Sequence, residues 1–165
     1  MLELEKGINS YLNLDEANEL IDGIDTTGKW RELTDGERKQ YLVLATIHID
    51  SLMLTSRKHK AEQQLQFPRG KSSEVPRAVL MAQALEALTL SDTQAMQRDS
   101  LREQGVTSIK LGNTSESYSD DSNSSSKQNN ELKSKVAMSL MRPYMLGSAA
   151  VSYTHLRAHE TRRHL

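Results

Sequence analysis

The sequence predicts a mainly α-helical protein: a small helical bundle with a short extended segment, a long polar loop and a C-terminal helix. Two capping boxes open stretches in which apolar residues recur at helical spacing. Only 36% of the 165 residues are hydrophobic and 4% are aromatic, which suits a compact helical core better than a thick β-sandwich. Cysteine is absent, which excludes disulfide scaffolds, thiol nucleophiles and cysteine-based zinc sites.

The first helix begins after Asn13. In the run NLDE, the Asn13 oxygen can accept a backbone N–H while Glu16 reaches back to the cap. Apolar residues follow at helical spacing up to Ile24. Gly23 and Gly28 mark the end of this helix and a loop that contains Trp30.

The second helix is expected to be the longest and to run from the capping box Thr34–Glu37 to about Leu54. Its core-facing band comprises Tyr41, Leu42, Ala45, His48, Ile49 and Leu52. Because His48 lies on this apolar stripe, we interpret it as a hydrogen-bonded structural histidine rather than as a metal ligand or a catalytic base.

A polar loop over 57–75 separates this helix from the next one. Pro76 stands where a first-turn proline is tolerated, because its missing N–H has no partner inside a helix. The following run, AVLMAQALEALTL, is apolar on nearly all sides. We therefore expect it to be the central helix.

The rest of the chain alternates polar and helical stretches. After Ser91 a polar helix is expected to run to Gly105, and 106–111 is expected to be extended. Residues 113–130 are rich in Ser, Asn and Asp and predict a mobile loop. A last helix over about 131–145 is interrupted near its end by Pro143.

The final residues, 151–165, need a separate interpretation. The run VSYTHLRAHETRRHL resembles a translated transposon-end and adapter sequence from library preparation. The four-residue spacing of His155 and His159 would suit metal ligands on a helix, but we favour a non-native origin. The expected organisation is therefore a helical domain, a flexible polar loop, a C-terminal helix and a non-native tail, over 1–112, 113–130, 131–149 and 150–165.

No catalytic constellation stands out along the chain. There is no G-x-S-x-G, no phosphate-binding glycine loop and no H-E-x-x-H motif. The pair Asp120–Asp121 falls in the polar stretch, which would not hold two acids in catalytic geometry. We expect a protein that is not an enzyme and that needs no metal or other cofactor.

Charge provides the one candidate binding region. Overall, 21 Lys and Arg residues oppose 22 Asp and Glu residues, for a net charge of -1. The segment 57–77, the basic loop, is nonetheless locally positive. It is either a solvated loop or, with Phe67, a surface that tracks phosphates and stacks bases. Its candidate DNA-facing residues are Arg57, Lys58, Lys60, Arg69 and Lys71. No stretch approaches 18 uninterrupted apolar residues, so we expect no membrane partner.

The order of several pieces resembles a family of small proteins encoded among the head genes of tailed bacteriophages. The pieces are INSYLNLDEANELIDG, the Trp30 loop, YLVLATIHIDSL, QQLQFPRG, the VPRAV helix start, QGVTSIKLGNTSESYS and MSLMRPYMLGS. The most telling residues within these pieces are Gln64, Phe67, Pro68, Arg69 and Pro76. These are head-completion, or head–tail adaptor, proteins, and some members carry the label of a DnaT-like single-stranded-DNA-binding domain.

The resemblance implies a structural head–tail connector that forms a homo-oligomeric ring beneath the portal, through which DNA passes. Its partners would be the portal and a tail-side connector protein, with a non-specific contact to DNA. It would be made in the host cytoplasm and reside in the virion. The candidate portal-docking residues are Val136, Leu140, Met141, Arg142 and Tyr144. The alternative is a DnaT-like single-stranded-DNA-binding protein of a phage.

Overall fold

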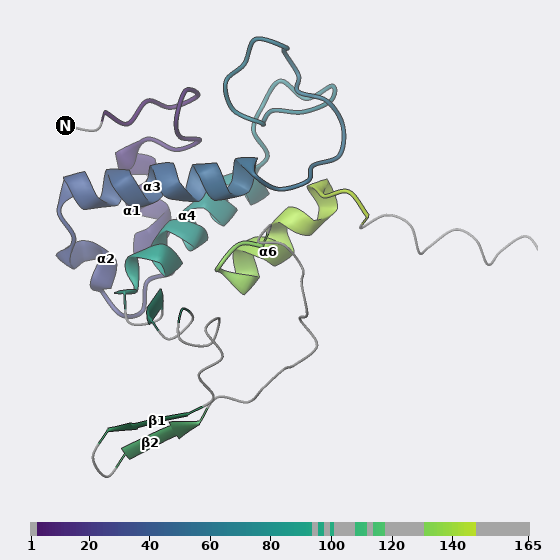
Figure 1. The fold of residues 1–165 in the computed structure, drawn as a ribbon. Coiled ribbons are helices and arrows are strands. Elements are labelled where there is room, and N and C mark those ends of the chain that lie inside the picture. Colours follow the sequence, from purple (N-terminus) through teal and green to yellow (C-terminus); the bar gives the residue numbers. More distant parts are fainter. Residues whose placement is uncertain are drawn as a thin grey trace, which may run out of the picture.

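The computed structural model describes residues 3–93, 96–97, 100, 108–111, 114–117 and 131–147. The fold is mainly helical, as predicted, and the helices form a small bundle around α4 (Figure 1). The bundle comprises α1 (Leu14–Asp22), α2 (Lys29–Glu32), α3 (Asp35–Asp50), α4 (Arg77–Ser91) and α6 (Lys135–Met141). No described helix has the length and apolar character needed to cross a bilayer.

Both predicted capping boxes are present. In α1 the Asn13 side chain accepts from the Glu16 N–H, and in α3 the Thr34 side chain accepts from the Glu37 N–H. The helix α3 ends at Asp50, four residues before the expected end at Leu54. Leu52 is nevertheless 5% exposed, because the turn after α3 still packs against the core. The apolar stripe therefore continues past the last helical residue.

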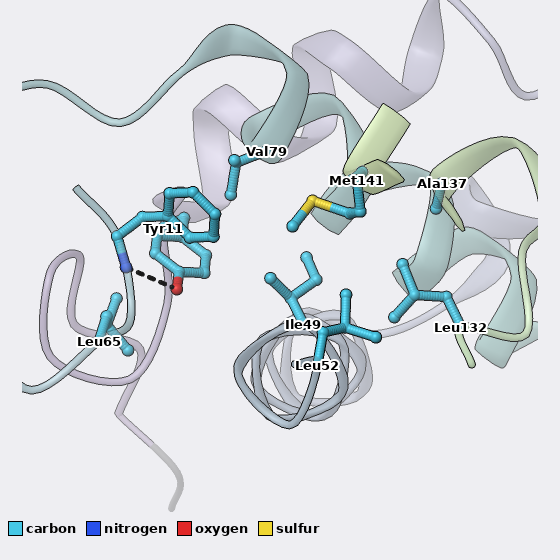
Figure 2. Close-up of a cluster of buried hydrophobic side chains, with 10 residues drawn as sticks. Tyr11, Ile49, Leu52, Leu65, Val79, Leu132, Ala137 and Met141 are labelled. Atoms are coloured by element: carbon cyan, nitrogen blue, oxygen red, sulfur yellow. Dashed lines mark hydrogen bonds between the residues drawn. The ribbon is translucent and has the colours of Figure 1, made fainter. Parts of the chain in front are cut away.

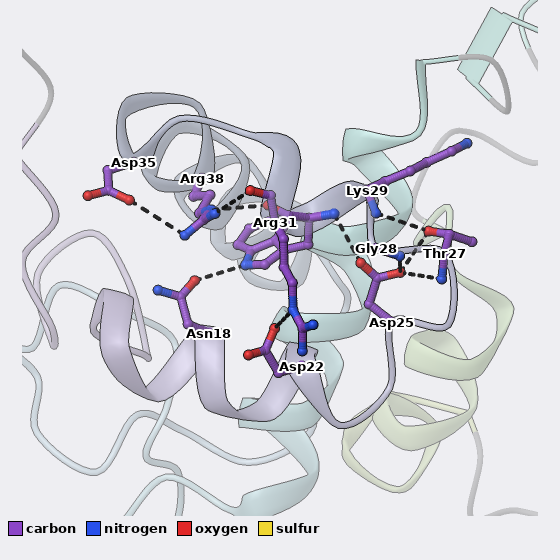
Figure 3. Close-up of polar contacts among 10 residues, drawn as sticks. Asn18, Asp22, Asp25, Thr27, Gly28, Lys29, Arg31, Asp35 and Arg38 are labelled. Atoms are coloured by element: carbon purple, nitrogen blue, oxygen red, sulfur yellow. Dashed lines mark hydrogen bonds and ion pairs between the residues drawn. The ribbon is translucent and has the colours of Figure 1, made fainter.

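The expected loop around Trp30 is instead the short helix α2, and its tryptophan is 1% exposed. Asp25 holds the turn before α2, where its carboxylate accepts the backbone N–H groups of Thr27, Gly28 and Trp30 (Figure 3). Gly28 has φ +74°, a left-handed conformation that suits glycine. The indole N–H donates to Asn18 of α1 at 2.9 Å. Sequence reasoning found the turn residues but not the helix that they start.

The predicted central helix is confirmed, since α4 contacts α1, α2, α3 and α6. Its N-terminal half contributes Val79 and Ala82 to one buried cluster, which also contains residues of α3 and α6 (Figure 2). Its C-terminal half contributes Ala84 and Ala87 to a second cluster around Trp30. Small side chains on α4 let the neighbouring helices approach it closely.

Two polar residues of α4 are fully buried. Gln83 donates through Nε2 to Ser10 Oγ, the Leu42 carbonyl and Thr46 Oγ1, at 2.7–3.0 Å. Its Oε1 accepts the Leu12 N–H at 3.1 Å. One side chain thus ties the N-terminal segment, α3 and α4 together, and its hydrogen-bonding groups are satisfied.

Glu86 does the same for the C-terminal region. Its Oε1 accepts the Lys133 N–H at 3.0 Å, and its Oε2 accepts the Ser134 N–H at 2.8 Å. His48 Nδ1 lies 2.8 Å from the same Oε1. His48 is thus hydrogen-bonded, as predicted, and its structural role stays a prediction. Since Ser134 is the N-cap of α6, the buried carboxylate holds the start of that helix against α4.

The C-terminal helix is shorter than the expected 131–145. The α-helix ends at Met141, and a 3-10 turn, η1 (Arg142–Tyr144), carries Pro143. The following strand-like residues pair with the chain after α3, since Thr55 N–H donates to the Tyr144 carbonyl at 2.7 Å and Leu146 N–H to the Met53 carbonyl at 2.8 Å. The end of the described chain is therefore fastened to its own domain.

Two short strands, β1 (Ser108–Leu111) and β2 (Thr114–Ser117), pair antiparallel with Ser108 opposite Ser117. The first falls in the segment predicted to be extended. The second occupies part of 113–130, where the sequence predicted a loop, because its backbone groups pair with β1. Most of the predicted helix up to Gly105, residues 118–130 and the tail lie outside the described residues.

Candidate functional site

The basic loop connects α3 to α4 and lies beyond the C-terminal end of α3 (Figure 1). Two segments of the loop, 57–59 and 68–70, pair with each other through backbone hydrogen bonds. Gly70 N–H donates to the Arg57 carbonyl at 2.9 Å, and His59 N–H donates to the Pro68 carbonyl at 3.0 Å. This pairing brings the two basic segments, around Arg57 and Lys71, next to one another although they are far apart in the sequence.

The loop is anchored by apolar side chains. Leu65 is 6% exposed and Phe67 is 3% exposed, and both belong to the cluster around α3 and α6. The Phe67 ring makes edge contacts with Tyr11 and Tyr144, with centroids 6.1 and 5.5 Å apart. The bond between Phe67 and Pro68 is cis. A segment that the sequence predicts as polar is thus attached to the core through its few apolar residues.

A hydrogen-bonded pair, Tyr11 and Asp50, fixes the backbone beside Phe67. The Tyr11 hydroxyl donates to Asp50 Oδ1 and accepts the Phe67 N–H at 3.3 Å. Asp50 Oδ2 accepts the Gln66 N–H at 3.3 Å. Sequence reasoning missed this pair, since Tyr11 and Asp50 are 39 residues apart and no local pattern joins them.

Burial explains the titration behaviour of this pair. It raises the pKa of the Tyr11 phenol well above its usual value, and the charge and hydrogen bond of Asp50 raise it further. Burial also raises the pKa of Asp50, although hydrogen bonds from Tyr11 and Gln66 act in the opposite direction. Tyr11 therefore remains a protonated donor over the physiological range.

Two of the five candidate DNA-facing residues have a structural task. The Arg69 guanidinium donates to the carbonyls of Thr55, Ser56 and Gln66 and to the Gln66 side chain. It also lies 6.0 Å from the centroid of the Phe67 ring. Lys58 Nζ donates to the carbonyls of Gln63 and Gln64 at 3.1 Å each. Both cations hold the loop in shape by satisfying its carbonyl groups.

The other three candidates, Arg57, Lys60 and Lys71, are exposed, as is Arg77 at the first position of α4. None of these four side chains makes an ion pair within the described part of the chain. Two exposed carboxylates, Glu62 and Glu74, lie in the same segment. The loop therefore presents free cations on a backbone that is fixed by other residues.

The remaining residues singled out from the sequence have varied positions. Gln64 is exposed, and Pro76 is the N-cap of α4. Of the candidate docking residues, Met141 is fully buried, and Leu140 and Tyr144 are half-buried against the same cluster. Val136 is 60% exposed and Arg142 is exposed. Only these last two present their side chains largely to the outside, and the docking role stays a prediction.

Other candidate sites are weaker. A cavity of about 230 Å³ lies near α2, lined by residues that include Asp25, Lys29 and Asp92. It is smaller than common ligand pockets, and an ion pair between Lys29 and Asp92 at 3.0 Å crosses it. In the described residues, no three His, Asp or Glu side chains gather as metal ligands would. His155 and His159 lie outside those residues.

Comparison with known proteins gives one match. The model of a family described as "Putative DnaT-like ssDNA binding protein" matches residues 3–160, nearly the whole chain. The matched range includes part of the segment 150–165, whose non-native origin stays a prediction. No curated protein and no solved structure matches the chain.

Proposed function

The chain belongs to the family described as "Putative DnaT-like ssDNA binding protein", and we propose that it binds single-stranded DNA through the exposed cations of the basic loop. The family match over residues 3–160 is the observation that carries this proposal. The geometry of the loop supports it, because the loop holds free cations on a fixed backbone at one end of the bundle.

The distribution of charge along the chain supports the same face. Residues 14–39, which form α1, α2 and the start of α3, hold eight carboxylates against four basic side chains, whereas the basic loop, 57–77, holds six basic side chains against two carboxylates. In the fold, α1 and α2 lie at one end of α3 and the basic loop at the other (Figure 1). A net charge of -1 therefore conceals two ends of opposite sign, and a polyanion would approach the loop end.

Preorganisation adds to this argument. A loop that ordered itself only on binding would lose conformational entropy in the complex. Here Phe67, Arg69 and the Tyr11–Asp50 pair already fix the backbone. The ordering has thus taken place during folding, and the exposed cations need only adjust their own side chains.

The test is binding of a fluorescently labelled 20-nucleotide oligo(dT) by the full chain, followed by anisotropy over a range of salt concentrations. The variant Arg57→Gln/Lys60→Gln/Lys71→Gln is expected to bind about tenfold more weakly or worse. Its slope of log K against log salt should become shallower by about 2, since each phosphate contact contributes about −0.7 to the slope on a single strand.

A control of equal charge removes three positive charges from outside the loop, as Lys6→Gln/Lys29→Gln/Arg31→Gln, in which each replaced cation forms an ion pair with an Asp or Glu side chain. Its net charge equals that of the loop variant, so any general electrostatic effect appears equally in both. Equal losses in the two variants would show that the loop is not the binding face. If the unaltered protein does not bind oligo(dT) at low salt, the proposed function is wrong.

A second candidate function is the head–tail connector, as a ring that contacts a portal. The observation that favours it is a set of large apolar side chains left exposed in the described residues, each between 44% and 61% exposed: Ile8, Leu44, Ile47, Met53, Val136 and Leu146. Exposed apolar side chains are used in subunit contacts where they gather in one patch. Light scattering during gel filtration, with and without the cognate portal, tests it. A monomer that does not associate with the portal would remove this candidate.

A further inference from the structure

We infer that the basic loop holds a nucleic acid strand by its phosphates alone, without stacking or reading a base, and therefore accepts single-stranded RNA and abasic strands as well as DNA. This inference rests on the proposed function and specifies the class of ligand that the same site takes. It follows from the aromatic and polar side chains of the loop that are buried or hydrogen-bonded within the protein itself.

Base stacking requires an exposed aromatic face. The sequence holds seven aromatic residues, of which Tyr118 and Tyr153 lie outside the described residues. Of the other five, Trp30 is 1% exposed, Tyr11 2% and Phe67 3%, while Tyr41 and Tyr144 are half-buried. In the described part of the chain none of these rings is fully exposed, and the one ring within the loop is buried.

The aromatic residue within the loop is unavailable for a further reason. Phe67 is in contact with Tyr11, Tyr144 and the guanidinium of Arg69. Turning the Phe67 ring out toward a base would expose it to water and would separate it from all three. Phe67 therefore anchors the loop to the core and is not presented to a base.

Three uncharged polar side chains of the loop that could contact base edges, those of Gln63, Gln66 and His59, are also engaged. Gln63 accepts the Lys60 N–H and donates to the carbonyls of Leu65 and Pro68. The Gln66 amide oxygen accepts from Arg69 at 2.7 Å, and His59 Nδ1 lies 3.2 Å from the Gly70 carbonyl.

Of the three glutamines in the loop, Gln64 is exposed, and only its main-chain carbonyl takes part in a bond described above. The one exposed amide of Gln64 would not distinguish four bases, because base-specific contacts need several matched donors and acceptors.

What remains directed outward is cationic. Arg57, Lys60, Lys71 and Arg77 can each pair with a phosphate, and the phosphate is common to DNA, RNA and abasic strands. Telling RNA from DNA requires a donor or acceptor placed at the 2′-hydroxyl. The uncharged groups named above, Gln63, Gln66 and His59, are engaged within the loop, so we expect the sugar not to matter either.

The experiment compares three labelled 20-mers of equal charge by anisotropy with the full chain: oligo(dT), oligo(rU) and an abasic deoxyribose strand. We expect the three affinities to agree within about threefold, with the same salt slope, which four phosphate contacts would set near −3. The variant Phe67→Leu, which keeps an apolar side chain of similar size, should bind oligo(dT) as the unaltered protein does. The variant Gln64→Ala should do the same.

The outcomes separate this inference from the proposed function. If oligo(dT) binds more than about tenfold more tightly than the abasic strand, bases are contacted and the inference is wrong, while the proposed function stands. A tenfold preference between DNA and RNA overturns it in the same way. If no strand binds, both proposals fail. A folded Phe67→Leu variant that loses binding of oligo(dT) but keeps binding of the abasic strand would identify Phe67 as a stacking residue and also overturn the inference.

Discussion

The basic loop and helix α4 differ in composition and are stabilised in opposite ways. The loop is polar, yet two buried apolar side chains, Leu65 and Phe67, attach it to the core. The helix is apolar on most sides, yet two buried polar side chains, Gln83 and Glu86, join it to its neighbours. Composition decides which segment is buried, but the residues that depart from each segment's average decide how it is oriented. Hydrogen bonds need defined partners, whereas apolar contact is not directional.

The largest expected effect comes from breaking the apolar anchor of the loop. The substitution Phe67→Ala should reduce the free energy of unfolding by about 3–5 kcal/mol, because it removes a buried aromatic side chain and leaves a cavity. Urea denaturation monitored by circular dichroism measures it. The exposed neighbour Gln64→Ala is the control and should have little effect. A loss below about 1 kcal/mol for Phe67→Ala would mean that the loop does not depend on this anchor.

The next largest effect is expected from removing the buried carboxylate of Glu86 in α4. The substitution Glu86→Ala leaves the N–H groups of Lys133 and Ser134 without their acceptor, so we expect a loss of about 1–3 kcal/mol. Hydrogen exchange should quicken first at Ser134 and Ala137, because the start of α6 loses its tie to α4. Glu19→Ala on the exposed side of α1 provides the control. Unchanged exchange in α6 would show that apolar packing alone places that helix.

A smaller effect is expected from the cation that closes the loop. The substitution Arg69→Lys keeps the charge but not the planar fork that reaches several carbonyls, and it should destabilise the protein by about 1 kcal/mol. For a chain of this size the thermal midpoint would fall by about 2–4 °C. Lys71→Gln removes a charge without a structural bond and should leave the midpoint unchanged. Equal shifts in both variants would contradict the division between structural and free cations.

The smallest effect concerns pH. Burial raises the pKa of Asp50 above that of an unfolded chain, so the folded state binds the proton more tightly. The associated stability is present below the ordinary aspartate pKa and is lost as pH rises through the raised value. From about pH 4 upward, the unaltered protein should lose stability relative to Asp50→Asn. Urea midpoints of both proteins at several pH values measure the difference, and parallel curves would contradict the shift.

Much of the fold follows from local sequence patterns. The capping boxes at Asn13 and Thr34 place the starts of α1 and α3, and the apolar run after Pro76 identifies the central helix. These signals involve residues within one or two helical turns of each other. The position of His48 on an apolar stripe likewise predicted a hydrogen-bonded histidine, and its partner is the buried carboxylate of Glu86.

Tertiary structure alone decided which cations are free. The sequence shows six basic residues between 57 and 77 and cannot separate Arg69, which satisfies loop carbonyls, from Lys71, which does not. It also could not place Tyr11 beside Asp50 or Glu86 beside Ser134, because these partners are 39 and 48 residues apart. Local patterns report the preferences of a segment for its own neighbours. Long-range hydrogen bonds form only when packing brings distant segments together, so they determine the loop's shape and the face that it offers to a ligand.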